Sequence, residues 1–175
     1  MTLRSAVRSA TQAVTEAMAA SDKEAASADI LKTLKDEHNE VKDLLSRLED
    51  ASGAAERKAL VKRIKAALVP HTKAEEKVVY DAVLRLRDKG AQEDGHEGYL
   101  EHEWAAKTLQ RLAGIRNATS PEHRATGKVL KELVEHHIRE EESNVWADVK
   151  SHFSDQQRVA MNRAFLAAKK RVKLT

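Results

Sequence analysis

Two ten-residue stretches, HTKAEEKVVY (residues 71–80) and HIREEESNVW (residues 137–146), follow one pattern. Each begins with a histidine, continues after three residues with Glu-Glu, and ends with a β-branched residue and a large aromatic one. Four residues advance an α-helix by about 400° and about 6 Å, so the histidine and the first glutamate share a helix face. Each stretch therefore predicts a helix that directs one imidazole and one carboxylate at the same object.

The repeat extends to the segments that precede these stretches. DEHNEVKDLLSRL (residues 36–48) aligns with LEHEWAAKTLQRL (residues 100–112), because both contain Glu-His and a leucine seven residues past the histidine. Each half of the chain thus supplies one lone histidine and one His-x-x-x-Glu pair. This pattern predicts a duplicated helix pair, with the polar residues duplicated as well.

The composition favours one soluble all-α domain. The chain has 175 residues, of which 41% are hydrophobic, enough for a single core, and its 6 glycines and 2 prolines leave few helix breakers. With no cysteine, the sequence excludes disulfides, thiolate metal sites and a cysteine nucleophile, and it suits the reducing cytoplasm, where we expect the protein. The net charge of +3 is too small to favour nucleic acid, so we predict no nucleic-acid partner. No apolar run approaches the ~20 residues of a membrane span.

Three parts follow from the helical periodicity. Residues 1–29 predict an N-terminal amphipathic helix and a linker, with a removable organellar presequence as the alternative, because the helix is rich in Arg, Ser and Ala and poor in acids. Residues 30–152 predict an up-down-up-down antiparallel four-helix bundle. Residues 153–175 predict a C-terminal helix and a basic tail. We expect both terminal helices outside the bundle, as candidate contacts of a homo-oligomer.

The four predicted bundle helices are bounded by capping and breaking residues. Asp29 is a candidate N-cap of the first helix, and Ser120 is the expected N-cap of the fourth, with Pro121 at its first position. The segment GAQEDGHEG (residues 90–98) is interpreted as the crossing between the halves, because three glycines punctuate it. Pro70 lies inside the second helix and predicts a bend just before His71, with a helix break as the alternative. His123 and His152 are expected at the surface. The expected helix limits are about 30–50, 54–89, 99–116 and 121–152.

Polar residues occupy positions on the apolar stripes of these helices, so we expect them to meet in the bundle interior. Burying unpaired carboxylates costs several kcal/mol, and two close carboxylates repel each other, so a metal cation is the simplest compensation. Imidazoles with carboxylates suit iron, zinc, manganese or copper and exclude an all-oxygen magnesium or calcium site. The candidate metal ligands are His38, His71, Glu75, His102, His137 and Glu141.

Six ligands are too many for one tetrahedral zinc. Two metals bridged by Glu75 and Glu141 would use all of them, with two histidines on each metal. The helix pairs suggest His38 with His71 on one metal, and His102 with His137 on the other. His136 has a glutamate at the same spacing, Glu140, but only the His137 register aligns both aromatic residues of the repeat.

The order His, His-x-x-x-Glu, His, His-x-x-x-Glu, with Glu-Glu ending each motif, resembles the hemerythrin-like HHE cation-binding family over about residues 30–150. The resemblance implies a non-haem di-iron centre with carboxylate and oxo bridges, held by the six residues named above. It also implies a small diatomic ligand or peroxide as partner (O₂, NO or hydrogen peroxide), or iron and oxygen sensing. Myohemerythrin is itself an up-down bundle, so the resemblance implies that topology too.

The sequence departs from the oxygen-carrying members of this family. They have a His-x-x-x-His pair where Ala106 follows His102, and they have an Asp five residues past a histidine where Glu141 stands at four. One metal is therefore left with an open position, or with Glu76, Glu142 or His96 as a substitute ligand. We expect redox or sensing chemistry in place of oxygen carriage, since an open position admits a substrate.

Two further questions stay open in the sequence. Tyr80 and Trp146 are expected as core aromatics, with Tyr80 as a candidate hydrogen-bond donor to a ligand or metal-bound oxygen. The alternative function is a metal-stabilised interaction or stress protein without redox turnover, in which zinc or iron holds the bundle and the terminal helices bind a partner. Zinc or manganese are also candidate occupants of the site in place of iron.

Overall fold

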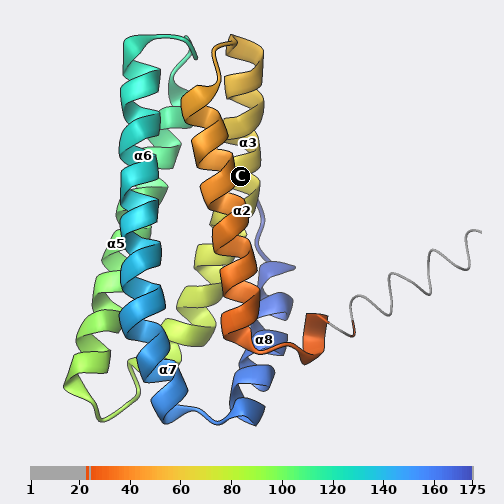
Figure 1. Ribbon diagram of the computed structural model, residues 1–175, viewed down its shortest axis with the longest axis vertical. Helices are drawn as coiled ribbons and strands as arrows, with labels where there is room; N and C mark the ends of the chain where they lie inside the picture. Colours follow the sequence, from red (N-terminus) through yellow and green to blue (C-terminus); the bar gives the residue numbers. More distant parts are fainter. Residues whose placement is uncertain (1–22, 24, 175) are drawn as a thin grey trace, which may run out of the picture.

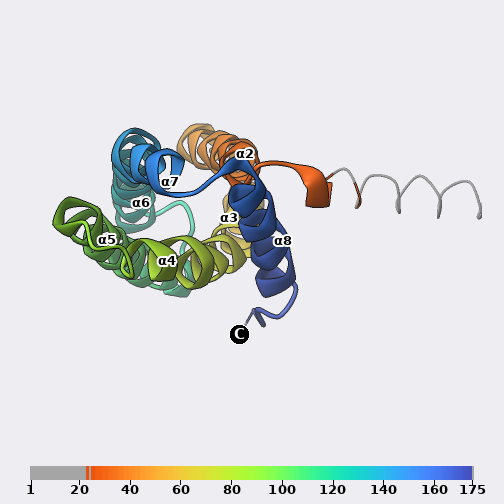
Figure 2. The same ribbon diagram turned by 90° about the horizontal axis from the view of Figure 1, so that it is seen from below.

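The computed structural model describes residues 23 and 25–174, and within them the regular secondary structure is all helical, with no β-strand. The predicted all-α class is therefore confirmed. Most of the helix predicted in the first 29 residues lies outside the described part. Four long helices lie side by side (Figures 1 and 2): α2 packs on α3 and α6, and α5 packs on α3 and α6. Their bounds are α2 Ile30–Asp50, α3 Ala54–Glu75, α5 Lys89–Gly114 and α6 Pro121–Glu140.

The helix starts follow the capping residues. Asp29 accepts a hydrogen bond from the Leu31 amide, and Ser120 accepts one from the His123 amide with Pro121 in the first turn, as the sequence predicts. The last helix, α8 (Asp155–Lys169), begins with a capping box between Ser154 and Gln157. It packs on α2 and α3, outside the four long helices (Figure 2).

The prediction of a loop at residues 90–98 is wrong. Asp88 caps the amides of Gly90 and Ala91, so α5 already starts at Lys89. No described glycine has a positive φ. Gly98 instead allows close packing, because a Cβ there would lie 2.6 Å from the Tyr80 ring. Gly98 thus serves helix contact, and a count of glycines alone does not distinguish that use from a turn.

The second and fourth predicted helices each change type at the glutamates. The α-helix α3 runs unbroken through Pro70, which excludes a break there, and ends at Glu75. The π-helix η1 (Glu76–Tyr80) and the short α4 (Asp81–Val83) follow, so the predicted end at residue 89 is too late. On the other side, η2 (Glu141–Val145) and α7 (Trp146–His152) follow α6. Both π-helices were missed by the periodicity, which assumes a constant turn.

Two apolar clusters form the core. One lies toward the α2–α3 and α5–α6 loops and contains Leu48 and Leu130, and the other lies toward α7 and α8 and contains Leu34 and Phe165. On α2, His38 falls between Leu34 of one cluster and Val41 of the other. A buried polar layer therefore separates the two clusters.

His123, predicted at the surface, is 2% exposed, and that prediction is wrong. The buried Arg57 guanidinium lies against its Nδ1 and also donates to the carbonyl oxygens of Leu48 and Ala51 at the end of α2. Those carbonyls lack helical partners, so Arg57 stabilises the helix end. The same guanidinium donates to His123 and holds it in the interior. His152 is exposed, as predicted. None of the described helices is both long and apolar enough to cross a membrane.

Candidate metal centre

The structure brings the six predicted ligands together in the polar layer. Each is at most 5% exposed. His38 comes from α2, His102 from α5 and His137 from α6, while Glu75 ends α3 and Glu141 begins η2. His71 lies one turn before Glu75 on α3, as the spacing requires.

Each glutamate lies between two histidines from different helix pairs. Glu75 Oε2 lies 3.2 Å from His71 Nε2 and 3.5 Å from His102 Nε2. Glu141 Oε2 lies 3.3 Å from His38 Nε2 and 3.5 Å from His137 Nε2. Two groups have ligand atoms that all lie within 4.8 Å of one another, and Glu75 belongs to both: His38, His71 and Glu75, and Glu75, His102 and His137.

The outer nitrogen of every one of the four histidines faces a further glutamate. A carboxylate accepts from Nδ1–H, which fixes the tautomer and leaves the Nε2 lone pair directed inward. These contacts repeat in the two halves of the chain. The glutamates just before the lone histidines, Glu37 and Glu101, contact the histidines of the two His-x-x-x-Glu motifs. The second glutamates of the two motifs, Glu76 and Glu142, contact the lone histidines. Three of the contacts are hydrogen bonds: His71 with Glu37 (3.0 Å), His137 with Glu101 (2.8 Å) and His38 with Glu142 (3.0 Å). The fourth, His102 with Glu76 (3.4 Å), lies within ion-pair distance but forms no hydrogen bond.

Sequence reasoning missed these roles, although the signal was present. Glu37 and Glu101 form part of the Glu-His that the two halves share. Glu76 and Glu142, considered as substitute ligands, face outer nitrogens instead. Each π-helix lies where two consecutive glutamates both turn to the centre, and such π segments often occur at functional sites. His96 and His136 are exposed, and His136 contacts Glu101 from outside at 3.5 Å.

Several inward polar atoms are buried without a hydrogen bond, although some of them lie within ion-pair distance of each other, and this is expected where a cation belongs. Among the described side chains, His38 Nε2, both Glu75 carboxylate oxygens and Glu141 Oε2 are buried and form no hydrogen bond. In addition, His102 Nε2 and His137 Nε2 face each other at 3.0 Å. Unpaired buried groups of this kind are costly, so the donor set fits a metal bound by imidazole and carboxylate.

The buried histidines and glutamates shift each other's pKa values when no metal is bound. Burial lowers the pKa of His71, but the carboxylates of Glu75 and Glu37 outweigh it and raise that pKa to about 10. Burial raises the pKa of Glu75, but His71 and His102 outweigh it and hold the pKa well below its usual range. At neutral pH the metal-free protein therefore holds a protonated His71 against an ionised Glu75.

The two aromatic residues of the repeat, Tyr80 and Trp146, make different contacts in the two halves of the site. Trp146 donates its Nε1–H to Glu141 Oε1 at 3.1 Å and stacks on His38 with 5.8 Å between ring centroids. Tyr80 lies against His102, and its buried hydroxyl has no partner. Burial raises the pKa of Tyr80 well above its usual range, and Glu141 and Glu75 add to the rise, so the hydroxyl keeps its proton.

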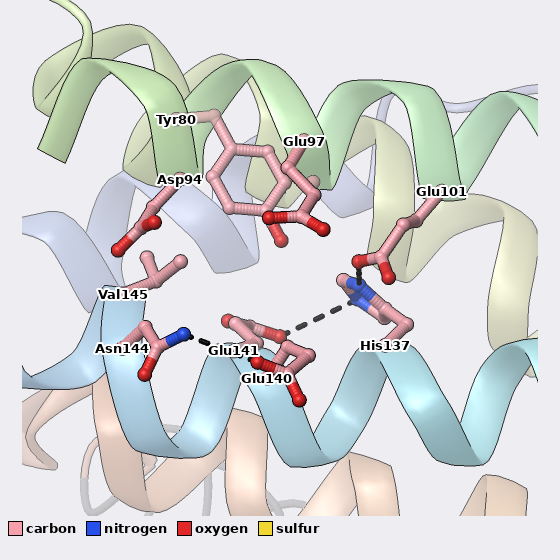
Figure 3. Close-up of a pocket in the computed structure, with 10 residues that line it drawn as sticks. Tyr80, Asp94, Glu97, Glu101, His137, Glu140, Glu141, Asn144 and Val145 are labelled. Carbon is pink, nitrogen blue, oxygen red and sulfur yellow. Dashed lines mark hydrogen bonds and ion pairs between the residues drawn. The ribbon is translucent and has the colours of Figure 1, made fainter. Parts of the chain in front are cut away.

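A small pocket reaches the centre beside Tyr80 (Figure 3). Its volume is about 10 Å³, close to what one water molecule needs. Figure 3 shows Glu97 and Glu101 of α5 facing Glu140 at the end of α6, with the Tyr80 hydroxyl between the two helices. The His102 and His137 half is therefore the accessible one. The other half is covered by Trp146 and by Phe165 of α8, whose ring lies 5.9 Å from that of His71.

The comparison with known families agrees with this geometry. The model of the hemerythrin HHE cation binding domain matches residues 29–147, more than half of the chain. The chain belongs to the hemerythrin HHE family. All six inward residues and the four outer glutamates lie within the matched part. The resemblance seen in the sequence is confirmed, and a cation site is the property that the family's name states.

The chain is also similar to a curated protein, a DNA nickase of Nostoc sp. strain PCC 7120, to which it is 27% identical over 136 residues. The match covers 78% of this chain and 38% of that protein. No solved structure matches the chain. The name of the relative gives no support to the prediction that nucleic acid is not a partner, and that prediction stays untested.

Proposed function

We propose that this HHE protein holds two iron ions and binds or reacts with O₂, peroxide or NO, in oxygen sensing, detoxification or iron homeostasis. The observation that carries the proposal is the placement of Glu75 and Glu141, each between histidines of different helix pairs. His38 and His71 would hold one metal, His102 and His137 the other, and both glutamates would bridge. Zinc or manganese are the alternative occupants, because the same donors bind them.

Bound iron would supply reversible electron transfer and an open coordination position for the small ligand. The residues of the chain orient the metal ligands and hydrogen-bond to the small ligand. The outer glutamates orient the imidazoles, and Trp146 holds one Glu141 oxygen. The Tyr80 hydroxyl can donate a hydrogen bond to a ligand beside His102. The acidic lining of the pocket favours neutral ligands, such as O₂, NO and hydrogen peroxide, over anions.

The architecture that we infer around this site is the up-down-up-down bundle of residues 30–152, with residues 1–29 and 153–175 outside it. The packing of α2 with α3 and of α5 with α6, each pair joined by a short loop, supports this order. The absence of cysteine supports the cytoplasm as the proposed location.

The test is the metal content and optical spectrum of the protein purified in air, followed by addition of hydrogen peroxide. Turnover of peroxide by iron-loaded protein supports an enzyme, and a reversible spectral change with O₂ but no turnover supports a binder or sensor. His71→Ala and Glu75→Ala should abolish either response, while the exposed-site variant His96→Ala should keep it. A protein that holds no iron under any loading condition contradicts the proposal.

The second candidate is a metal-stabilised interaction protein. Leu100 and Trp104, one turn apart on α5, are 50% and 52% exposed, and Val129 of α6 is 47% exposed. Leu100 and Trp104 line one surface hollow, and an exposed apolar patch of this kind is typical of a contact surface. Partner binding that survives Glu75→Ala but fails with Trp104→Ala, without redox activity in either protein, would favour this function.

The match covers only 38% of the nickase relative, so DNA binding by this chain needs a direct test. Lys58, Lys62 and Arg63 of α3 are exposed and form no ion pair with the described residues. Binding of labelled duplex that weakens with salt and with Lys62→Ala would show a phosphate contact. The prediction of no nucleic-acid partner expects no binding at physiological salt.

A further inference from the structure

The metal centre is closed on most sides, so a cation needs a defined route to it. Lysines cover three of the four outer glutamates: Lys169 pairs with Glu37, Lys35 with Glu142, and Lys73 with Glu76. Each of these ammonium groups repels an approaching cation.

The fourth outer glutamate is different. Glu101 contacts His137 and His136, and no described lysine or arginine pairs with it. Glu101 lines the pocket that leads to the centre. One corner of the site is therefore without a covering cation.

The mouth of this pocket carries uncompensated negative charge. Asp94, Glu97 and Glu140 line it together with Glu101, and no lysine or arginine is among the described residues that line it. Burial raises the pKa of Asp94, and Asp148, Glu97, Glu93 and Glu140 raise it further. One Asp148 oxygen is itself buried without a partner. Carboxylates that repel one another in this way are relieved by a cation.

At its inner end the pocket offers partners to a cation that has passed the mouth. The Tyr80 hydroxyl is fully buried, lacks a hydrogen-bond partner and points into the pocket between α5 and η2 (Figure 3). Glu141, whose Oε2 also lacks a hydrogen bond, and the His137 ring line the same space. The route therefore ends on two of the proposed ligands.

We propose that this pocket, the acidic port of Asp94, Glu97, Glu101 and Glu140, is the route by which a divalent metal cation reaches the centre. The carboxylates at the mouth attract the hydrated cation and replace part of its water. Tyr80 and Glu141 then take over as it moves to His137. The inference rests on the proposed metal centre, and it assigns Asp94, Glu97 and Glu140 a role in uptake and none as final ligands.

The experiment follows Co²⁺ uptake by the metal-free full chain through the visible absorption of the bound ion, with the bound metal counted after equilibrium. The triple variant Asp94→Asn, Glu97→Gln, Glu140→Gln removes the charge of the mouth. The control Glu40→Gln, Asp50→Asn, Glu56→Gln removes the same charge from exposed positions elsewhere. Steering of this kind changes association rates by about 10–10³-fold.

We expect the port variant to take up Co²⁺ at least about tenfold more slowly, with less dependence on salt and with the final stoichiometry unchanged. The control should load within about twofold of the original rate, since distant exposed charges are screened. Equal rates in the two variants would overturn the port. A lower final stoichiometry in the port variant would also overturn it, because the mouth residues would then be ligands. An original protein that binds no Co²⁺ refutes the metal centre itself.

Discussion

Glu37, Glu76, Glu101 and Glu142 are the residues that turn four buried histidines into an oriented set. A histidine on an apolar helix face is ordinarily held by any nearby acceptor, whereas here each outer nitrogen has its own carboxylate. Oriented imidazoles with inward Nε2 atoms are pre-organised for a metal, because little side-chain freedom remains to be lost on binding.

Glu37→Gln should lower metal affinity by about 10–100-fold while the fold is retained, since the amide keeps the shape but not the charge that holds the His71 Nδ1–H. The measurement is a competition titration against a chelator of known affinity. Glu40→Gln, an exposed change on the same helix, is the control and should leave affinity unchanged. Equal affinities for Glu37→Gln and the control would show that the outer carboxylate does not act on the site.

The buried His123 should make the fold sensitive to mild acid. Burial lowers its pKa, and Arg57 and Arg124 lower it further, so the folded pKa lies below the unfolded value near 6.5. The unfolded chain then binds more protons. The stabilising contribution is complete above about pH 6.5 and is lost as the pH falls toward and through the folded pKa.

Urea unfolding in the presence of chelator, at pH 7.5 and pH 5.0, measures this contribution. The original protein should lose more free energy of unfolding between the two pH values than His123→Gln, which keeps an acceptor for Arg57 but cannot be protonated. Parallel losses in the two proteins would exclude His123 as the source.

At the scale of the elements, the helix type changes where the chemistry is. Each π-helix begins at or directly after an inward glutamate, and η1 carries Tyr80 to the contact with α5. A continuous α-helix would turn these residues to other directions, because each residue advances it by about 100°. The wider turn is therefore part of how Glu75 and Tyr80 both reach the polar layer.

Gly98→Ala tests the contact between α5 and η1. The added Cβ would meet Tyr80 carbon and oxygen atoms at 2.6–2.9 Å, so the ring must move, and we expect a loss of about 1–3 kcal/mol in the free energy of unfolding. Gly114→Ala is the matched control, because nothing lies within 4 Å of its Cβ position. It should be neutral or stabilising by up to about 1 kcal/mol. Denaturant unfolding that gives both variants equal stability would contradict the contact.

The sequence predicted most of this arrangement for physical reasons that can be named. Periodicity and caps predicted α2 and the start of α6, because Asp29 and Ser120 act locally. The duplicated motifs predicted which six side chains meet, because the spacing of His71 and Glu75 fixes a helix face. The π-helices, the helical start of α5 and the burial of His123 depend on tertiary contacts with Tyr80 and Arg57, which local patterns do not contain.

At the scale of the whole molecule, two similar halves meet at one polar layer, and the surroundings make them unequal. Trp146 and Phe165 of α8 cover the His38 and His71 half, while the acidic port opens on His137. Under the proposed function, the covered position would serve mainly for structure and the open one would meet the ligand. The proposed function therefore requires both positions to be filled.

The measurement that tests this most directly is the number of metal ions per chain, counted by native mass spectrometry of the original protein and of two neighbouring variants. His137 is buried in the centre and His136 is exposed, so His136→Ala serves as the control for His137→Ala. We predict two metal ions in the original protein and in His136→Ala, and fewer in His137→Ala. No metal in the original protein, or an equal count in all three, would contradict the prediction.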